Sequence, residues 1–437
     1  MPKFNITTLG CKVNQAESEA IAQDLLSAEW SPTAGCDQAE VCIVNTCTVT
    51  QKASMQSRQA IRQAIRSNPD ARIIVTGCYA QCAPQEINKI EGVDYIVGHD
   101  DKLAISRLVR TNGDRTADNN LQAVNGGPRK LLFQRMPAAI SAARTRPFLK
   151  VQDGCDAFCT YCIVPYARGR SRSLPLNNVL QSVQKLAEAG YHEVVLTGIH
   201  LGAYGRDLSP AVDLAQLLRR IQESALIDRV RLSSIEPLEL SREIIQIVAE
   251  SDMFCRHFHI PLQSGDDRVL KKMGRPYSRL AFQDLILRLN DLVPDAAIGA
   301  DVLIGFPGED EQAFDNTYSL LEGLPVSYLH VFPFSARPGT PAAKFTDHIP
   351  RDIIKDRCDL MRRLGQDKRV RFYRQSVGKT LPLLIETRRD ATSGLLKGMS
   401  SNYLPVLIDA GDECKNKIID VKVEKLKENK LYGIHTD

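Results

Sequence analysis

Several absences set the first limits on this chain. Its 437 residues contain no run of about 18 apolar residues, so no membrane-spanning helix is expected. The opening residues Met1-Pro2-Lys3-Phe4 lead directly into a strand-like stretch without a signal-peptide pattern, and we therefore expect a cytoplasmic protein. Neither charge sign dominates, because the net charge is only +4, which by itself says little about a nucleic-acid partner.

Cysteine is the residue type that the sequence has in excess. The chain carries 12 cysteines within an otherwise ordinary globular composition of 43% hydrophobic and 25% charged residues. Without a secretory signal, that number favours metal or redox chemistry over a disulfide framework. The length allows two or three domains.

Residues 1–110 alternate between strand and helix patterns, which predicts an α/β domain with a doubly wound parallel sheet. The expected strands are Phe4–Leu9, Val41–Asn45, Ile73–Thr76 and Asp94–Val97, and the expected helices lie near Gln15–Trp30, Thr50–Ser67 and Asp101–Arg110. Residues 111–147 are punctuated by Asn, Asp, Gly and Pro and are interpreted as a linker. Its basic residues are Arg115, Arg129, Lys130, Arg135, Arg144 and Arg146.

Residues 148–375 resume the alternation, and the remainder of the chain changes character. Six strands are expected, at Phe148–Gln152, Glu193–Thr197, Arg229–Ser233, Phe258–Leu262, Ala300–Ile304 and Leu329–Phe334. A full eight-unit barrel needs about 250 residues, so a partial (β/α)6 barrel fits better. Residues 350–375 form a basic amphipathic helix. Residues 376–437 predict a small all-β barrel, with strands at Leu381–Glu386, Leu404–Ile408 and Lys417–Leu426.

Three cysteines lie close together directly after the first expected barrel strand, at Cys155, Cys159 and Cys162. Three thiolates at this spacing can hold three irons of a 4Fe-4S cluster and leave the fourth iron open. An open iron can chelate the amino and carboxylate groups of S-adenosylmethionine and reduce its sulfonium. The alternatives are a zinc knuckle or core thiols, but no second Cys pair follows at a zinc-like distance. Bacterial ferredoxins also order their gaps differently.

A second group of cysteines is dispersed along the chain. Cys11, Cys47 and Cys78 each follow an expected strand of the N-terminal sheet. The carboxyl ends of parallel strands share one edge, where such folds bind ligands. The three thiols either converge there as a second open cluster or are small residues in separate tight turns, and the pattern alone leaves both readings open.

The remaining cysteines and two histidines carry weaker signals. Cys42 is expected to face the core, and we find no spatial reason for Cys36, Cys82, Cys255, Cys358 or Cys414. His257 and His259 have an i, i+2 spacing that suits metal ligands, but they are interpreted as polar side chains on one face of a strand.

Polar residues at the carboxyl ends of the barrel strands are candidates for cofactor binding. These candidates are Thr197, Gly198, Ser234, Glu236, Gln263, Gly305 and Arg337. For each of these residues taken alone, a role in a turn or a helix cap is the simpler explanation. The basic helix, with Arg362, Arg363, Lys368, Arg369, Arg371 and Arg374 around Phe372 and Tyr373, is either a phosphate-binding surface or a solvated face.

The assembled motifs resemble the methylthiotransferase family of radical S-adenosylmethionine enzymes. The resemblance rests on Thr8-Leu9-Gly10-Cys11-Lys12-Val13-Asn14-Gln15, Asn45-Thr46-Cys47-Thr48-Val49, Thr76-Gly77-Cys78-Tyr79-Ala80-Gln81 and the Cys155 run, in the order of the family. It implies two 4Fe-4S clusters, on Cys11, Cys47 and Cys78 and on Cys155, Cys159 and Cys162. It further implies S-adenosylmethionine as radical source and methyl donor, and an RNA-binding TRAM barrel at the end.

Within the family the chain resembles the branch that acts on threonylcarbamoyladenosine in tRNA (the MtaB type). The stretches that carry this are Phe148 to Cys155, Thr197 to Gly202 and Leu329 to Ser335. The implied partners are a tRNA anticodon stem-loop and a reducing donor such as flavodoxin or ferredoxin, with no membrane. An Arg or Lys is expected to bind the threonylcarbamoyl carboxylate, with Arg337 as the candidate.

Three alternatives remain at this stage. Two keep the chemistry and change the substrate to isopentenyladenosine in tRNA or to an aspartate of a ribosomal protein. The third is an iron–sulfur protein that binds RNA without turnover.

Overall fold

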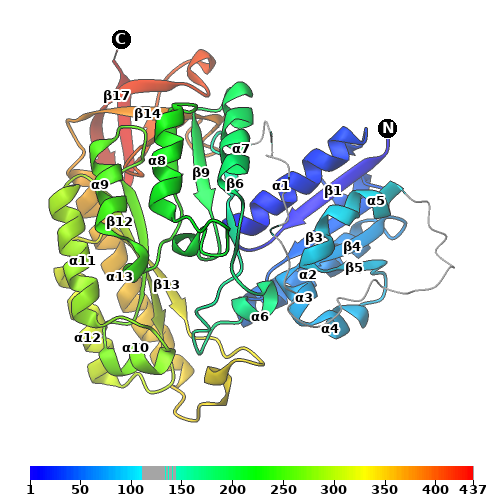
Figure 1. The fold of residues 1–437 in the computed structure, drawn as a ribbon, viewed down its shortest axis with the longest axis horizontal. Helices are drawn as coiled ribbons and strands as arrows, with labels where there is room; N and C mark the ends of the chain where they lie inside the picture. The colour runs from blue at the N-terminus through cyan, green and yellow to red at the C-terminus, as the bar shows by residue number, and fades with distance from the viewer. Residues whose placement is uncertain (111–132, 134–135, 137–139, 141–143, 437) are drawn as a thin grey trace.

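The computed structural model describes residues 1–110, 133, 136, 140 and 144–436. These residues form three parts in chain order, which are an N-terminal α/β part, a central α/β part and a C-terminal β barrel (Figure 1). The expected linker lies largely outside the described residues, so its interpretation stays a prediction. No helix in the described part of the chain has the length and apolar character needed to span a membrane.

The N-terminal part is a five-stranded parallel sheet with the order β2-β1-β3-β4-β5. Its strands are β1 (Lys3–Thr8), β2 (Ser31–Pro32), β3 (Val41–Thr46), β4 (Arg72–Gly77) and β5 (Tyr95–Val97). Its helices are α1 (Lys12–Ser27), α2 (Gln51–Ser67), α3 (Cys78–Cys82), α4 (Pro84–Asn88) and α5 (Ile105–Arg110). The expected doubly wound sheet is confirmed, and β2 is an additional short strand at its edge.

Successive apolar side chains of the central strand β3 point to opposite faces of the sheet, which explains why helices cover both faces. In β3, Val41 and Ile43 pack in one apolar cluster with residues of α1 and α5. Cys42 and Val44 pack in a second cluster with residues of α2. Because β1, β3 and β4 are neighbours in the sheet, their carboxyl ends lie side by side.

The central part is the expected partial barrel. Its six strands form two parallel three-stranded sheets, β10-β9-β6 and β11-β12-β13, linked through a single bridge between Val230 and Phe254. The strands are β6 (Phe148–Lys150), β9 (Glu193–Thr197), β10 (Arg229–Leu232), β11 (His257–Gln263), β12 (Ala297–Ile304) and β13 (Tyr328–Pro333). Two short strands, β7 (Gln152–Asp153) and β8 (Arg172–Ser173), pair with each other beside β6.

Helices cover the outer face of this partial barrel (Figure 1). They are α7 (Leu176–Glu188), α8 (Leu214–Ser224), α9 (Arg242–Glu250), α10 (Asp267–Met273), α11 (Arg279–Leu292) and α12 (Glu311–Gly323), whereas α6 (Val164–Arg168) lies beside α3 of the N-terminal part. Val230 and Leu232 of β10 belong to the main apolar core with residues of these helices. The alternate residues Arg229 and Arg231 are buried on the other side. The inner face of the barrel is therefore charged, which suits a site for polar ligands.

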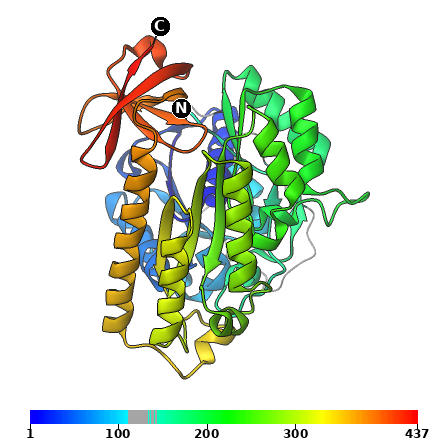
Figure 2. The same ribbon diagram turned by 90° about the vertical axis from the view of Figure 1, so that its left-hand side faces the viewer.

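The basic helix α13 (Arg351–Arg374) runs beside the barrel strands and leads into the closed C-terminal barrel β14-β15-β16-β18-β17 (Figure 2). Its strands are β14 (Thr380–Arg389), β15 (Leu396–Ser400), β16 (Pro405–Ile408), β17 (Ile418–Lys427) and β18 (Lys430–His435). The sequence did not predict β15 and β18. Gly398 and Gly433 interrupt these two short strands, which weakens their strand signal.

Part of the basic helix serves packing instead of solvent exposure. Lys368 is buried, and its Nζ donates to the carbonyl oxygens of Glu322 and Leu324 at 3.1 and 2.8 Å. Burial lowers the pKa of Lys368 to about 8. Phe372 and Tyr373 pack against the core of the C-terminal barrel. These three residues are therefore unavailable for the RNA contacts that the sequence suggested for them.

Candidate metal and cofactor centre

The first cysteine group occupies one loop that follows β7. The loop is fixed by backbone hydrogen bonds from Cys155 N to Gly169 O at 3.1 Å and from Thr160 N to Met273 O at 2.9 Å. Cys159 is buried, while Cys155 and Cys162 are half-buried. Burial raises the pKa of the Cys162 thiol to about 12, and the neighbouring sulfurs of Cys159 and Cys155 act in the same direction. A metal or a nearby cation is therefore needed to hold Cys162 as a thiolate.

Two cationic or ionisable side chains contact this cysteine loop. Arg275 donates from Nη1 to the Sγ of Cys159 at 3.3 Å and forms an ion pair with Glu236. His200 places Nδ1 3.4 Å from the Sγ of Cys155 and Nε2 2.8 Å from the Glu239 carboxylate. Donors of this kind stabilise negative charge on sulfur and tune an iron–sulfur centre.

The second cysteine group is assembled from three strand ends, as the convergence reading predicted. Cys11 follows β1, Cys47 follows β3 and Cys78 follows β4. Burial raises the pKa of Cys78 to about 12, and the nearby sulfurs of Cys47 and Cys11 raise it further. The three thiols therefore lie within electrostatic reach of one another.

Glycines before two of these cysteines permit the close approach. Gly10 has φ +96°, and a Cβ added there would lie 2.9 Å from the Sγ of Cys47. Gly77 has φ +97°, and a Cβ there would lie 2.3 Å from the Thr46 carbonyl oxygen. Only glycine combines this backbone conformation with the missing side chain.

Neither cysteine group has the close ligand spacing of a single-ion site. The sulfurs of a tetrahedral zinc site lie about 4 Å apart, given Zn–S bonds of about 2.3 Å. Among the described residues, the group that places three ligand atoms within 4.8 Å is His259, Asp301 and His330. Neither cysteine group meets that spacing. Three thiolate donors in each group match a 4Fe-4S cluster with one open iron, so the donor set fits the cofactor.

A buried network of charges connects the two cysteine groups. Glu17 of α1 pairs with Lys102, Lys150 and Arg168. Asp153, two residues before Cys155, pairs with Arg168 at 2.9 Å. Burial alone would raise the pKa of Glu17, but Arg168, Lys102 and Lys150 hold it well below its ordinary value. The network therefore fixes the N-terminal part to the central part through ion pairs of Glu17 with Lys150 and Arg168.

Arg168 is the member of this network whose charge acts most directly on the second cysteine group. Its guanidinium donates to Asn14 at 2.6 Å and to Glu17 at 3.0 Å. Burial would lower its pKa, but Glu17, Cys78, Asp153 and Cys11 raise it well above its ordinary value. The Arg168 charge opposes the effect of burial on the pKa of Cys47 and of Cys78, and so favours the thiolate form of these two residues.

The predicted cofactor-binding residues are distributed unevenly. Glu236 reaches the first cysteine group through Arg275, and Gly198 packs against the Gln152 side chain beside it. Thr197 is buried at the end of β9, Ser234 is exposed after β10, and Gln263 ends β11 with φ +68°.

Two of the predicted cofactor-binding residues are engaged elsewhere. Gly305 packs against Ile354 of α13, where a Cβ would lie 2.4 Å from that side chain. Arg337 donates from Nη2 to the hydroxyls of Thr48 at 2.8 Å and Ser54 at 2.9 Å. It therefore joins the loop after β13 to the N-terminal part next to Cys47.

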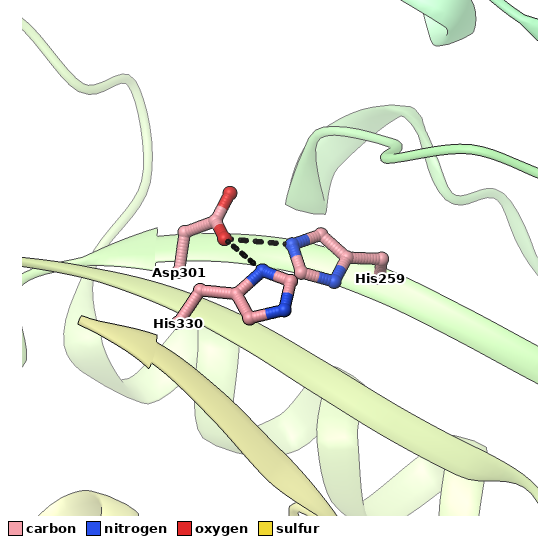
Figure 3. A group of neighbouring side chains, drawn as sticks. All are labelled: His259, Asp301 and His330. Carbon is pink, nitrogen blue, oxygen red and sulfur yellow. Dashed lines mark hydrogen bonds and ion pairs between the residues drawn. The ribbon is translucent and has the colours of Figure 1, made fainter. Parts of the chain in front are cut away.

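His257 and His259 belong to a hydrogen-bonded chain on the barrel strands, and Figure 3 shows the part of it formed by His259, Asp301 and His330. The Tyr328 hydroxyl lies 2.8 Å from Nε2 of His257 and 3.0 Å from Nδ1 of His259. Nε2 of His259 lies 2.8 Å from Asp301, which His330 also contacts at 3.3 Å. Both ring nitrogens of His259 have protein partners, which agrees with the interpretation of His257 and His259 as polar side chains on one face.

A cavity of about 230 Å³ opens where the three parts of the chain meet, and we call it the junction cavity. Its lining residues are Lys12, Arg144, Thr145, Arg146, Phe148, Val195, Arg231, Glu386, Thr387, Arg388 and Tyr403. Burial lowers the pKa of Lys12, and the charges of Arg231 and Arg146 lower it further. The cavity is thus strongly cationic, which the sequence analysis missed because its cations come from four separate segments.

The other cysteines include one difference from expectation. Cys36 and Cys42 form a disulfide, whereas the sequence was interpreted without one. Cys36 lies in a short 3-10 helix that turns back onto β3, and a separation of six residues alone does not reveal this contact. Cys82 is exposed at the end of α3, and Cys255, Cys358 and Cys414 are buried without a role in either cysteine group.

Comparisons with known proteins agree with this architecture. Residues 3–98 match the model of uncharacterized protein family UPF0004, and residues 149–321 match the Radical SAM superfamily. A solved radical S-adenosylmethionine methyltransferase, TsrM from Kitasatospora setae, aligns with a TM-score of 0.56 at 15% identity. The alignment covers 89% of this chain and 79% of that one, and it shows a shared fold.

Curated relatives span nearly the whole chain. The threonylcarbamoyladenosine tRNA methylthiotransferase MtaB of Bacillus subtilis is 38% identical over 96% of this chain and 93% of its own length. The MtaB of Aquifex aeolicus is 37% identical over 92% and 98%. A tRNA-2-methylthio-N(6)-dimethylallyladenosine synthase of Syntrophotalea carbinolica is 32% identical over 99% of both chains.

Proposed function

Because the chain belongs to the radical S-adenosylmethionine methylthiotransferase family, we propose that it converts threonylcarbamoyladenosine beside the tRNA anticodon into its 2-methylthio derivative. The observation that carries the proposal is the presence of two three-cysteine groups, one in a loop and one at three strand ends, in a chain that is 38% identical to an MtaB enzyme. One group serves radical formation and the other serves sulfur transfer.

Each cysteine group has a proposed ligand role. Cys155, Cys159 and Cys162 would hold the cluster that binds S-adenosylmethionine, and Cys11, Cys47 and Cys78 would hold the second cluster. When bound, the first cluster would supply a 5′-deoxyadenosyl radical from S-adenosylmethionine. The second cluster would supply a sulfur that is methylated by a second S-adenosylmethionine and transferred to C2 of the base.

The side chains around the clusters position and shield the reaction. Arg275 would hold the Cys159 sulfur, and Glu236 would keep Arg275 in place. Arg168 would favour the thiolates of Cys47 and Cys78. Thr197, Gly198, Ser234 and Gln263 stay candidates for S-adenosylmethionine contacts at the strand ends, while the packing of Gly305 and Arg337 favours structural roles for those two.

We propose the domain limits 1–110, 148–375 and 376–437, with 111–147 as linker and the last domain as a TRAM-type RNA-binding module. Closure of its five strands into a barrel supports that assignment. A tRNA substrate also implies the cytoplasm as compartment and a soluble reductant, such as flavodoxin or ferredoxin, as electron donor.

A second candidate substrate is dimethylallyladenosine in tRNA, favoured by the relative at 32% identity. Mass spectrometry of tRNA nucleosides from cells with and without this gene separates the two. Loss of 2-methylthio-threonylcarbamoyladenosine alone supports the proposal. Loss of only the dimethylallyl derivative supports the second candidate and contradicts the first.

A further inference from the structure

Two cations of the junction cavity, Lys12 and Arg388, have no carboxylate partner among the described residues, and Arg388 is exposed at the barrel side. Lys12 lines the cavity from the first turn of α1, and its side chain is half-buried. Within the described part of the chain, its ammonium has neither an ion pair nor a hydrogen bond. A lysine that is partly desolvated without a partner costs free energy, so its position calls for an anionic ligand.

The other buried and half-buried cations of the junction cavity, Arg231, Arg146 and Arg144, are already paired. Arg231 binds the Glu193 carboxylate at 2.8 Å and also donates to the backbone carbonyl oxygens of Ser400 at 3.0 Å and Ser401 at 2.9 Å. Arg146 binds Glu386 at 2.9 Å.

Arg144 completes this set of paired arginines. It binds Glu19 at 2.7 Å and Gln15 at 2.8 Å. The half-buried ammonium of Lys12 is therefore available to donate to a small anion in the cavity. The positive charges of the paired arginines would add to the attraction.

We propose that the ammonium of Lys12 binds the carboxylate of the threonylcarbamoyl group and so selects this base over neutral ones. This inference rests on the proposed function and names the residue that reads the substrate. It also replaces Arg337 as the candidate, because Arg337 is bound by Thr48 and Ser54.

The position of Lys12 in the chain suits this role. It directly follows Cys11, a proposed ligand of the cluster that delivers sulfur. The reacting atom of the base is C2, and the urea of a threonylcarbamoyl group can fold toward N1, which puts the carboxylate on the ring edge that carries C2. A cation one residue from a cluster ligand can therefore contact the carboxylate while C2 faces the sulfur.

The same cation could instead bind a phosphate of the anticodon loop, and a thermodynamic cycle distinguishes the two anions. Wild-type enzyme and Lys12→Gln are each measured with synthetic anticodon stem-loops that carry threonylcarbamoyladenosine or unmodified adenosine. Loss of a carboxylate contact affects only the first RNA. Loss of a phosphate contact affects both RNAs equally.

The account predicts that Lys12→Gln weakens binding of the threonylcarbamoyladenosine RNA by about 10- to 100-fold, the usual value of a charge-assisted hydrogen bond. Binding of the unmodified RNA stays near its wild-type value. Lys12→Arg restores most of the difference, because it keeps the charge. Arg388→Gln is the matched control from the exposed barrel side of the same cavity, and it should change both RNAs by one common factor.

Iron content and 5′-deoxyadenosine formation are measured in every variant, so that damage to the adjacent cluster is recognised. Equal weakening of both RNAs by Lys12→Gln, or an unchanged preference, would overturn the inference. A wild-type enzyme that forms no methylthio product from the threonylcarbamoyladenosine RNA would instead overturn the proposed function. The two failures are therefore distinguishable.

Discussion

Each of the two cysteine groups offers three thiol ligands, but the fold brings these ligands together in different ways. Cys155, Cys159 and Cys162 lie in one loop, held by backbone bonds to Gly169 and Met273. Cys11, Cys47 and Cys78 come from three strand ends and meet only because β1, β3 and β4 are neighbours. The first group depends on local spacing and the second on the complete sheet. A change in the sheet should therefore disturb the second group and leave the first intact.

We call Cys155, Cys159 and Cys162 the loop group, and Cys11, Cys47 and Cys78 the strand-end group. The largest effect is expected when a ligand of the loop group is removed. In Cys155→Ala we expect cleavage of S-adenosylmethionine to fall to the background rate, since an incomplete ligand set cannot hold the cluster that binds it. Formation of 5′-deoxyadenosine, followed by chromatography, is the readout. Cys255→Ser is a matched control, because Cys255 is buried away from both groups, and it should retain cleavage. Substantial 5′-deoxyadenosine from Cys155→Ala would contradict the assignment.

The next effect concerns the charge network that joins the two groups. Glu17→Gln leaves Lys102, Lys150 and Arg168 without their shared buried carboxylate. We expect a loss of about 3 kcal/mol in the free energy of unfolding, as for other broken buried ion pairs. Denaturant unfolding provides the measurement. Glu223→Gln, which removes an exposed ion pair with Arg220, should cost less than about 1 kcal/mol. Equal losses in the two variants would show that the network does not join the parts.

A smaller and more selective effect is expected at Arg275. Arg275→Gln removes a charged donor to the Cys159 sulfur, so the oxidised, less negative state of that cluster becomes relatively more stable. We expect a lower reduction potential for the cluster on the loop group and no change for the other. Redox titration followed by electron paramagnetic resonance resolves the two. A shift of both potentials, or of neither, would argue against a specific contact.

The smallest effect is expected at the helix cap that follows Cys47 of the strand-end group. Thr50 caps α2 by accepting from Ala53 N at 3.0 Å, three residues after Cys47. Thr50→Ala should lower the free energy of unfolding by about 1 kcal/mol. Asp213→Ala removes a comparable cap from α8, where the Asp213 carboxylate accepts from Gln216 N at 2.8 Å, and α8 supplies no residue to either group. Both variants should lose similar stability, but only Thr50→Ala should reduce iron occupancy, and only in the strand-end group. Equal iron content in the two would remove the link between this cap and the group.

The two groups also differ in how far the sequence could predict them. The loop group could be predicted from spacing alone, because all three ligands lie within eight consecutive residues. The strand-end group required the sheet order, which hydrophobic alternation indicated but did not prove. Strand boundaries in both α/β parts followed the same alternation and agree with the structure within a few residues, whereas β15 and β18 were too short and glycine-containing to be recognised.

Side chains that act across long separations could not be predicted. Arg275 contacts Cys159 over 116 positions, and Arg168 contacts Glu17 over 151 positions. Neither residue lies in a pattern that distinguishes it from a surface arginine. Lys12 stands in a motif that was recognised, but its lack of a partner became visible only with the junction cavity. Such contacts depend on tertiary packing, which local sequence patterns do not encode.

The central claim is that the two cysteine groups perform separate steps, and Cys47→Ala tests it most directly. After anaerobic reconstitution, the account predicts about four irons fewer than wild type, continued 5′-deoxyadenosine formation and no methylthio product on tRNA. Methylthio product at the wild-type level from this variant would contradict a role for the strand-end group in sulfur transfer. Loss of 5′-deoxyadenosine in a variant that keeps the iron of the loop group would contradict the separation of the two steps.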